Sequence, residues 1–358
     1  MKILHCADVH LESKLNKNFD RIKARERRDE LINTFLRMVK YAADNNVRAI
    51  LIAGDLFDSE DIRATARNAV ADCIMENYNI DFFYIRGNHD SDGFLEGLKE
   101  VPDNLKTFDD SWSTYEIKGK KINVTISAKE LKNDNLEGTS DDLWLEEEDI
   151  NIVMLHGQEN ERAIREYKDK CIDYLALGHI HSYCCERLDA RGVWCYSGCL
   201  EARGFDECGI HGFVEIDIDE NNGDITHKLI PFAKRAVIEV VSDVSGLEST
   251  YEMISKIKKD ASGLSVKSDD MIKVVLTGDT SMECEKDVEY IRTNLSEEFY
   301  MVKVEDNTRT SLNVRQYLYD ESLKGEFVRC VLKDETLNDE DKAQIIRYGI
   351  DALLGEVK

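Results

Sequence analysis

The sequence predicts an α/β fold with a mainly β second half, and three features of the chain support this. Apolar runs of strand length alternate with segments of helical period over roughly the first 230 residues. One of these runs, VRAILIAGD, is almost entirely apolar, which is typical of a strand covered on both faces. After Tyr183 the pattern changes to shorter alternating strands, VWCYSG, HGFVEIDID and ITHKLIPF.

The elements of this first region follow in order along the chain. A buried strand, MKILHCAD, runs into polar residues. Residues 20–46 and 62–78 repeat apolar side chains at helical spacing, with VRAILIAGD between them. Three more apolar strands are then expected at DFFYIRGNHD, DINIVMLHG and DYLALGHIH.

From about Arg235 the chain predicts a separate β-α-β-α-β unit. Its strands are RAVIEVVSDVSG, MIKVVLTGD and EFYMVKVED, and its helices cover residues 247–261 and 284–295. The remaining residues look mostly helical, with Asn338 as the N-cap of a last helix. Its apolar face consists of Ala343, Ile346, Ile350 and Leu353. We therefore expect three domains, at 1–234, 235–310 and 311–358.

Composition indicates a globular protein and limits its surroundings. The chain is 42% apolar and 33% charged, and no apolar stretch approaches the ~20 residues of a membrane span. The start, MKILHCADVH, lacks the apolar run of a signal peptide, so we expect a cytoplasmic protein. Its ten cysteines show no C-x-x-C pair and are expected to be free thiols.

Polar residues follow five of the predicted strands directly. Because ligands bind outside the carboxyl ends of strands in open α/β sheets, these residues should converge on one site. Imidazole and carboxylate without thiolate suit Mn, Fe or Zn, and the set is large enough for two ions. The strand ends are Asp8-Val9-His10, Gly54-Asp55, Gly87-Asn88-His89-Asp90, His156-Gly157 and Gly178-His179-Ile180-His181.

Local geometry and the remaining histidines complete this interpretation. Asp8 and His10 are two residues apart, so both can point to one side of an extended segment, and His179 and His181 repeat the spacing. Nearby glycines allow sharp turns beside the ions. His5, His211 and His227 join no cluster and are interpreted as ordinary core or surface residues. Asp279 is interpreted as a turn residue.

The order of these motifs resembles the calcineurin-like metallophosphoesterases. The motifs stand here as ADVH, GDLFD, RGNHD, MLHG and GHIH, within residues 8–181. HCADVHLES and the C-terminal stretch beginning SLKGEFVRCVLKDE are similar to the DNA repair exonuclease branch, which includes the SbcD and YhaO-type nuclease subunits. YSGCLEARGFDECGIHGF resembles the YhaO-type variant and departs from the Pro-Gly-Ser run of SbcD. The resemblance implies a four-layer metallophosphoesterase β-sandwich flanked by helices, a smaller α+β cap domain and a helical C-terminal segment.

The resemblance also implies roles for the clustered residues. One ion would be held by Asp8, His10, Asp55 and His181, and the other by Asp55, Asn88, His156 and His179, with Asp55 bridging. His89 would serve as general acid or as a hydrogen-bond donor to the transition state, and Asp90 would support it by orienting its ring. Asp58 either assists in the same way or is a solvated loop carboxylate.

The expected activity is hydrolysis of a phosphodiester in DNA, by an exonuclease and endonuclease subunit in repair and recombination. Two divalent ions, expected to be Mn²⁺ with Fe or Zn as alternatives, would activate a hydroxide that attacks phosphorus while His89 protonates the leaving oxygen. The alternative is a phosphodiesterase or phosphatase for small nucleotides. The additional ~125 residues favour DNA, since a small substrate does not require them. A scaffold with a degenerate site is disfavoured because every metal motif is complete.

The net charge of −25 opposes a broad electrostatic grip on DNA. A basic patch after the first motif either contacts phosphates or is a solvated helix face with pairs such as Arg25–Asp29. The resemblance implies an SMC-type coiled-coil ATPase partner bound through the C-terminal segment, and it allows a homodimer. The candidate partner contacts could instead pack on their own domain. The patch is Lys14, Lys17, Arg21, Lys23, Arg25, Arg27 and Arg28, and the contacts are Leu323, Phe327, Val328, Ile346, Ile350 and Leu353.

Overall fold

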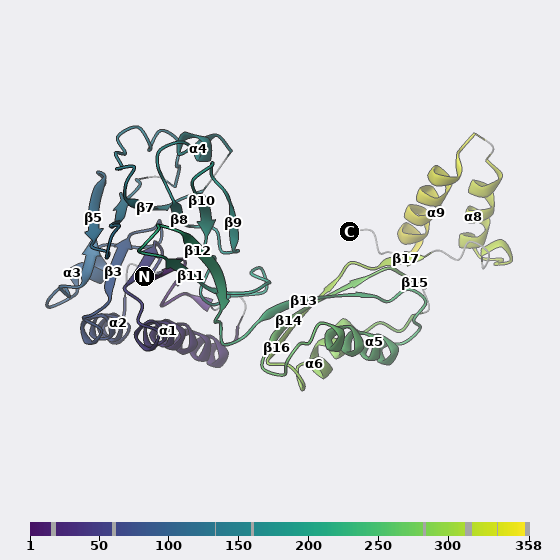
Figure 1. Ribbon diagram of the computed structural model, residues 1–358. Helices are drawn as coiled ribbons and strands as arrows, with labels where there is room; N and C mark the ends of the chain where they lie inside the picture. Colours follow the sequence, from purple (N-terminus) through teal and green to yellow (C-terminus); the bar gives the residue numbers. More distant parts are fainter. Residues whose placement is uncertain are drawn as a thin grey trace. The chain divides into compact units, whose positions relative to one another are not determined.

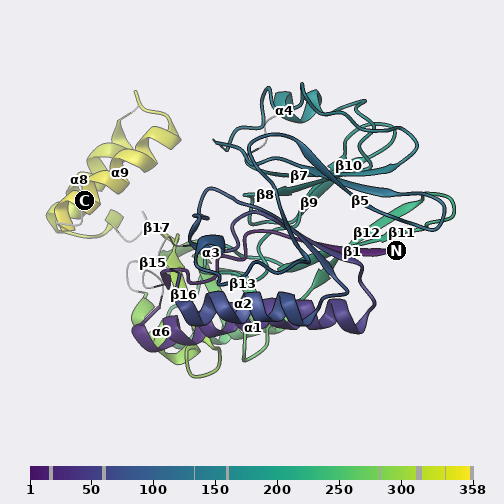
Figure 2. The ribbon, with the colours of Figure 1, turned by 90° about the vertical axis from the view of Figure 1, so that its left-hand side faces the viewer.

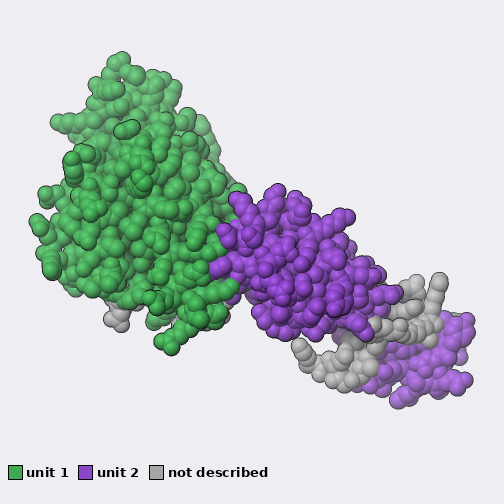
Figure 3. Space-filling model, turned by 90° about the horizontal axis from the view of Figure 1, so that it is seen from below, with its two compact units in different colours: residues 1–238 green, residues 239–358 purple. Residues whose placement is uncertain are grey.

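A computed structural model describes most of the 358 residues and divides the chain into two compact units (Figure 3). Unit 1 is Met1–Ile238 and unit 2 is Glu239–Lys358. The described residues are 1–15, 19–58, 62–132, 134–158, 161–281, 284–311, 317–334 and 336–354.

Unit 1 is built on two six-stranded sheets (Figure 1). Strands β1 to β4 of the first sheet are parallel, as are β6, β7, β8 and β10 of the second. The first sheet has the order β12 (Ile225–Pro231), β11 (Gly212–Ile218), β1 (Lys2–Cys6), β2 (Ala49–Ala53), β3 (Asp81–Ile85), β4 (Leu105–Thr107). The second has the order β5 (Ser113–Ile117), β6 (Val124–Ala128), β7 (Ile150–His156), β8 (Tyr174–Gly178), β10 (Val193–Tyr196), β9 (Cys184–Arg187).

Helices cover the outer faces of the two sheets and make four layers. α1 (Arg21–Asp44) and α2 (Ala64–Glu76) lie side by side against the first sheet (Figures 1 and 2). α4 (Glu161–Glu166) lies on the second sheet, where Ala163 joins a buried cluster with Leu175 and Trp194. The short α3 (Gly93–Glu96) follows β3. The predicted α/β class and the helix-flanked β-sandwich are confirmed.

The main core lies between the sheets and explains the long apolar runs. Leu51 of β2 and Met154 of β7 belong to one buried cluster, and every residue of both strands is buried. A strand with both faces covered has no polar-facing positions, so its sequence does not alternate. The predictions missed β4, β5, β6 and β9, none of which is a continuous apolar run.

Unit 2 contains a three-stranded sheet with two helices and a separate helical hairpin. The strands β13 (Val237–Asp243), β14 (Met271–Thr277) and β16 (Met301–Asp306) are accompanied by α5 (Thr250–Gly263) and α6 (Val288–Leu295). Asp279, interpreted from the sequence as a turn residue, instead begins the short strand β15 (Asp279–Ser281), which pairs with β17 (Arg309–Ser311). None of the described helices in either unit is long and apolar enough to cross a membrane.

The hairpin consists of α8 (Leu323–Lys333) and α9 (Asp339–Leu354). Asn338 caps α9 as predicted, because its side-chain oxygen accepts the Asp341 N–H at 2.8 Å. Three of the candidate partner contacts, Val328, Ile346 and Ile350, pack with Tyr317 in a buried cluster. The prediction that these three residues contact a partner is therefore wrong, because packing between the two helices already buries them. Leu323 and Leu353, in contrast, are exposed.

The predicted basic patch also needs a correction. Arg27 is 1% exposed and pairs with Glu30 and Glu201 inside unit 1, so it cannot contact DNA. Lys17 lies outside the described residues. The other members, Lys14, Arg21, Lys23, Arg25 and Arg28, are exposed or half-buried at and before the start of α1.

The Arg27 cluster is a buried ion network that anchors the start of α1. Glu30 contacts Arg27, accepts from Arg235 at 2.7 Å and pairs with Lys234 at 2.8 Å. Burial by itself would raise the pKa of Glu30, but the hydrogen bonds from Arg235 and Lys234 and the charge of Arg27 lower it to about 2. The network joins α1 to the chain segment that leaves the first sheet.

Replacing Glu30 by Gln is expected to lower the free energy of unfolding of unit 1 by about 3 kcal/mol, because two buried guanidinium groups each lose one of their carboxylate partners. Urea unfolding followed by tryptophan fluorescence measures this, since Trp112, Trp144 and Trp194 all belong to unit 1. Glu26→Gln is the matched control: its side chain is 47% exposed and lies 3.6 Å from Arg235. It should cost less than about 1 kcal/mol.

The same pair of proteins tests the sign of the pH dependence. Because the pKa of folded Glu30 is lowered to about 2, its contribution is present above its ordinary pKa of 4.5 and is lost as pH falls toward 2. The stability difference between the native chain and Glu30→Gln should therefore shrink over that range. Equal stability of the two at neutral pH would contradict the network's role.

Candidate metal centre

All seven predicted ligands lie together at the carboxyl ends of strands from both sheets. Asp8 and His10 follow β1, Asp55 follows β2, and Asn88 follows β3. From the second sheet, His156 ends β7, and His179 and His181 follow β8. Both layers of the sandwich thus contribute to one site, and the ligands keep the positions that their strands give them.

Interatomic distances divide these residues into two groups. In the first group, His10 Nε2 lies 3.2 Å from His181 Nε2 and 3.6 Å from Asp55 Oδ2. His181 Nε2 lies 4.0 Å from Asp8 Oδ1. This is the set that the family resemblance assigns to one ion.

The second group meets the first at Asp55. His156 Nε2 lies 3.5 Å from Asp55 Oδ2 and 3.0 Å from Asn88 Oδ1, and His179 Nδ1 lies 3.2 Å from the same amide oxygen. Asp55 Oδ2 is therefore the atom common to both groups. Its other oxygen, Oδ1, accepts the His89 N–H at 2.9 Å, which holds the carboxylate with Oδ2 facing both groups.

Hydrogen bonds at the far ring nitrogens select the ligand atoms of three imidazoles. His156 Nδ1 donates to the Ala53 carbonyl at 2.9 Å, and His181 Nδ1 donates to Glu207 Oε1 at 2.7 Å. His10 Nδ1 lies 3.1 Å from Asp58 Oδ1. In each ring Nε2 is left with a lone pair facing the cluster, as in carboxylate–histidine–metal arrangements.

The donor set fits divalent cations. Two lone pairs on His10 and His181 face each other at 3.2 Å, which is unfavourable unless a cation lies between them. Atoms bound at about 2.1 Å to one ion are about 3 to 3.5 Å apart, which is close to the distances above except the 4.0 Å between His181 and Asp8. Asp8, His10 and His181 offer ligand atoms within 4.8 Å of one another, as do Asp8, Asp55 and His156.

Burial makes this arrangement costly without a counter-charge. Asp8 is 1% exposed, and burial raises the pKa of its carboxyl group. Burial likewise lowers the pKa of His10. A cation removes both penalties, because it stabilises the ionised carboxylate and needs the neutral imidazole.

The backbone at the site is strained, which corrects one expectation. Asp8 and His10 have φ angles of 50° and 48°, so the segment after β1 is not extended. Asp55 and His179 also have positive φ, at 52° and 104°. Such conformations cost of order 1–3 kcal/mol each and persist only where surrounding structure holds them. Here the His10 N–H donates to the Asp55 carbonyl at 2.9 Å and ties the first two loops together.

Two glycines are required by close approach. A Cβ at Gly54, whose φ is 91°, would lie 2.1 Å from His156 Nδ1. A Cβ at Gly87 would lie 2.2 Å from Asp55 Oδ1. Both positions leave room for the groups that position the candidate ligands.

His89 lies at the rim of the site, and its orientation differs from the expectation. Its Nδ1 is 2.8 Å from Asp58 Oδ1, so Asp58, rather than Asp90, orients the ring. Asp90 accepts the backbone N–H groups of Leu56, Phe57 and Gly87 instead. Burial raises the pKa of Asp90 to about 7 despite these bonds. Asp90 thus supports the loop that carries Asp55, because its short side chain points back into that loop.

Asp58 and two residues that the sequence interpretation missed form a second layer. Arg203 pairs with Glu207 at 3.0 Å and lies 3.6 Å from Asp58 Oδ1. It therefore connects the carboxylate behind His10 and His89 with the carboxylate behind His181. The only sequence signal was the unusual YSGCLEARGFDECGIHGF stretch, in which Arg203 and Glu207 are four residues apart.

The three isolated histidines have other surroundings. His5 is buried, and its Nδ1 lies 3.0 Å from the Tyr174 hydroxyl. His211 is buried beside Cys199, at 3.2 Å, and its Nε2 donates to the Glu207 carbonyl. His227 contacts Cys185. None of the three lies among the candidate ligands.

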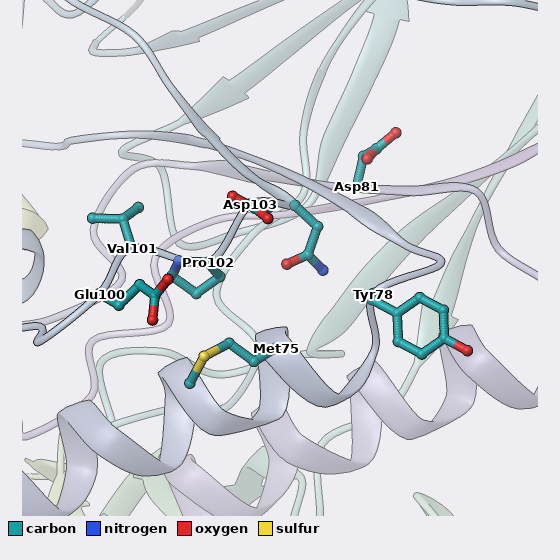
Figure 4. A pocket seen from close by; sticks show the side chains of 8 residues that line it. Met75, Tyr78, Asp81, Glu100, Val101, Pro102 and Asp103 are labelled. Carbon is teal, nitrogen blue, oxygen red and sulfur yellow. The ribbon is translucent and has the colours of Figure 1, made fainter.

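A separate hollow of about 400 Å³ lies near the amino end of β3, whereas the candidate ligands follow the carboxyl ends (Figure 4). Met75 and Tyr78 line it from the end of α2 and the residues after it. Its acidic side chains, Asp81, Glu100 and Asp103, do not suit a phosphate ligand. The hollow is therefore not part of the candidate centre.

The fold and this set of side chains define a metal-dependent phosphoesterase with a two-metal site. Residues 1–183 match the calcineurin-like phosphoesterase family, and the chain belongs to that family.

Curated relatives with partial similarity are archaeal DNA double-strand break repair proteins named Mre11. The protein of Methanosarcina acetivorans is 26% identical over 276 residues, covering 71% of this chain and 42% of that protein. The protein of Methanosarcina mazei is 34% identical over 100 residues, covering 25% of this chain and 14% of that protein. That of Sulfolobus acidocaldarius is 31% identical over 93 residues, covering 25% and 23%. The chain thus spans less than half the length of each of these relatives.

Two solved structures are also similar to this chain. A protein from Thermus thermophilus has a TM-score of 0.40 and 11% identity, covering 64% of this chain and 98% of its own. A dimetal phosphatase from Danio rerio has a TM-score of 0.38 and 13% identity, covering 64% and 99%.

Glu207→Gln should weaken divalent-metal binding about 10–100-fold, because the carboxylate that orients His181 loses its charge. Isothermal titration calorimetry with Mn²⁺ measures this on the full chain. Glu186→Gln, an exposed carboxylate on β9, is the matched control and should bind as the native chain does. Unchanged affinity in Glu207→Gln would show that this contact does not act on the metal.

Gly87→Ala should abolish tight metal binding at the bridging position, since its methyl group would displace Asp55. Metal content after dialysis, measured by inductively coupled plasma mass spectrometry, should fall by about one ion or more per chain. Gly263→Ala is the control, because a Cβ there meets nothing within 4 Å. Full metal content in Gly87→Ala would contradict the proposed bridging role of Asp55.

Proposed function

We propose that the protein is a metal-dependent DNA nuclease, the catalytic subunit of a repair exonuclease and endonuclease, with Mn²⁺ as its metal. Asp8, His10, Asp55 and His181 would hold one ion, and Asp55, Asn88, His156 and His179 the other. His89 would be the general acid. Membership of the phosphoesterase class does not identify the substrate, and this proposal names DNA as that substrate.

The exposure of the site is the observation that favours a polymeric substrate over a small molecule. Asp8, His10, Asp55 and His156 are buried, whereas Asn88 and His89 are exposed and His179 and His181 are half-buried. The His89 side chain is 46% exposed. Sites for small molecules usually bury most of the ligand in a pocket. A shallow rim instead admits one phosphodiester of a long strand.

Similarity beyond the catalytic domain supports the same choice. The family match ends at residue 183, but the alignment with the Methanosarcina acetivorans repair protein covers 71% of this chain. Some of the shared sequence therefore lies outside the phosphoesterase motifs. Those parts are what would distinguish a DNA enzyme from a small-molecule phosphoesterase.

The chain's own residues would perform three tasks in the reaction. When bound, two divalent ions neutralise phosphate charge and lower the pKa of nearby water. Asp58 holds His89 by its Nδ1 at 2.8 Å, which leaves Nε2 to donate a proton to the departing sugar oxygen. The buried ligands exclude bulk water from the inner side of the site. Arg203 keeps Asp58 and Glu207 in place between these groups.

Further contacts with DNA and a partner belong to the proposal as well. The exposed basic residues Lys14, Arg21 and Arg25 could contact backbone phosphates near the site. An SMC-type coiled-coil ATPase is the proposed partner of the C-terminal hairpin, whose Leu323 and Leu353 are exposed. These contacts would supply the affinity for DNA that the acidic surface of the chain does not provide.

The substrate assignment is tested by comparing linear duplex DNA with bis(p-nitrophenyl) phosphate, each with Mn²⁺ and then with a chelator. We expect Mn²⁺-dependent cleavage of both, and loss of both activities with chelator. DNA digestion is followed on gels, and hydrolysis of the small ester by absorbance. Hydrolysis of small nucleotide esters with no DNA cleavage, even with the ATPase partner added, would favour the small-nucleotide alternative.

His89→Gln should lower kcat about 10²–10⁴-fold while both metals stay bound, because the general acid is lost but the candidate ligands are untouched. Steady-state kinetics on DNA, whose leaving group is an alkoxide, and metal content of the same sample measure the two quantities. A substrate with a p-nitrophenolate leaving group, which needs no proton, should be less affected than one with an alkoxide leaving group. Equal loss on both substrates would contradict the acid role.

A further inference from the structure

In unit 1, two cysteines that are not among the candidate ligands lie directly opposite each other on neighbouring strands. Cys185 of β9 pairs with Cys195 of the antiparallel β10. The hairpin closes with the Leu188 N–H donating to the Gly192 carbonyl at 3.0 Å. Because hydrogen-bonded and non-bonded pairs alternate, the Cys185–Cys195 pair is a non-hydrogen-bonded one, with Cα atoms about 4.5 Å apart. That separation is within the range that disulfides span.

Both sulfurs are on the inner face of the hairpin but differ in access. Cys195 is 0% exposed and belongs to the cluster between the sheets, and Cys185 is half-buried and packs against that cluster. Both cysteines are free thiols. The partly exposed Cys185 is therefore the candidate attacking cysteine, and the fully buried Cys195 opposite it the candidate resolving cysteine.

A histidine from the other sheet contacts the accessible thiol. His227 Nε2 lies 3.1 Å from Cys185 Sγ. β9 and β12 are edge strands of different sheets, so this contact joins the two layers of the sandwich. The Cys195 thiol and His227 both act as hydrogen-bond donors to the Cys185 sulfur, and together they lower the pKa of Cys185. The neighbouring Cys185 and burial raise that of Cys195.

We propose that Cys185 and Cys195 form a reversible, peroxide-reactive dithiol, with His227 as the group that activates Cys185. The Cys185 thiolate attacks one oxygen of a hydroperoxide; an S–O bond forms, the O–O bond breaks, and hydroxide leaves from hydrogen peroxide. The Cys195 thiol then attacks the Cys185 sulfur. The S–S bond forms, the S–O bond breaks, and water leaves with the Cys195 proton. The two sulfurs supply the two electrons, and a dithiol reductant reverses the change.

This inference is independent of the proposed nuclease function, because it concerns a thiol pair and uses no phosphoester readout. The site is nevertheless near the metal centre in sequence, since Cys185 follows His181 by four residues. Oxidation would link β9 to β10, and Cys199, which follows that strand pair, donates its N–H to the His181 carbonyl at 3.0 Å. The pair therefore lies where a covalent link restrains the segment that carries a candidate ligand.

The test uses the full chain and an internal reference thiol, the exposed Cys330 of α8. The protein is treated with increasing hydrogen peroxide, alkylated, digested without reductant and analysed by mass spectrometry. We expect a peptide pair lighter by two hydrogen atoms, which dithiothreitol restores, at peroxide concentrations that leave Cys330 unmodified. Fragmentation must place the link at Cys185–Cys195 and not at Cys184 or Cys199. Oxidation of Cys330 before any such link forms would overturn the proposal.

Two variants test the separate roles of the resolving thiol and the histidine. Cys195→Ser should leave a sulfenic acid on Cys185 that dimedone captures. His227→Gln should slow alkylation of Cys185 by iodoacetamide at pH 7 about tenfold, with the rate at Cys330 unchanged. An unchanged Cys185 rate in His227→Gln would remove His227 from the site. If either variant fails to fold, the peroxide experiment still tests the proposal, because it uses the native chain.

Discussion

The organisation of unit 1 depends on the convergence of ionisable side chains at the candidate metal centre, which is partly shielded from water. Asp8 and Asp55 are each 1% exposed and lie among four imidazoles. Asp8 and Asp55 are carboxylates among the candidate ligands, and Asp58 and Glu207 are carboxylates directly behind them, leaving Asp90 aside. Arg203 is the cation that pairs with Asp58 and Glu207. With neutral imidazoles this cluster is negative, and divalent ions reverse the sign. Bound divalent ions would therefore balance the charge of this cluster.

Packing holds these charged groups where they are. Strands β2 and β7 are buried along their whole length, so the loops that follow them begin from fixed points. The loops after β1 and β2 are hydrogen-bonded to each other, including the bond from Leu11 N–H to the Leu56 carbonyl at 2.9 Å. This support compensates for the positive φ angles at Asp8, His10 and Asp55. The rigid core and the strained loops together keep the lone pairs of the candidate ligand atoms facing one another. Without this support the side chains would move apart.

The sequence was sufficient to locate the site, and the reason is physical. Parallel strands end at one edge of a sheet, so residues at strand ends can be placed without knowing any side-chain rotamer. The same argument cannot find Arg203 and Glu207, because they belong to an irregular segment whose path depends on tertiary contacts. The family resemblance assigned the His89 contact to the neighbour in sequence, Asp90, with Asp58 as a further candidate; Asp58, from another loop, makes the contact. Arg27 shows the same limit: a charged run in the sequence does not reveal which member turns inward.

An acidic chain that hydrolyses an anionic substrate is consistent with these contacts. The carboxylates nearest the site face imidazoles, a guanidinium or backbone N–H groups, so their charge is directed at the ligands and not at the open rim. At physiological ionic strength, charges beyond about 8 Å are largely screened, so the remaining acidic surface contributes little at the site. In the proposed reaction, the field that a phosphodiester meets would be set by the bound ions, His89 and the basic groups at the rim. For the proposed DNA substrate, net charge would therefore restrict where a strand binds more than whether it binds.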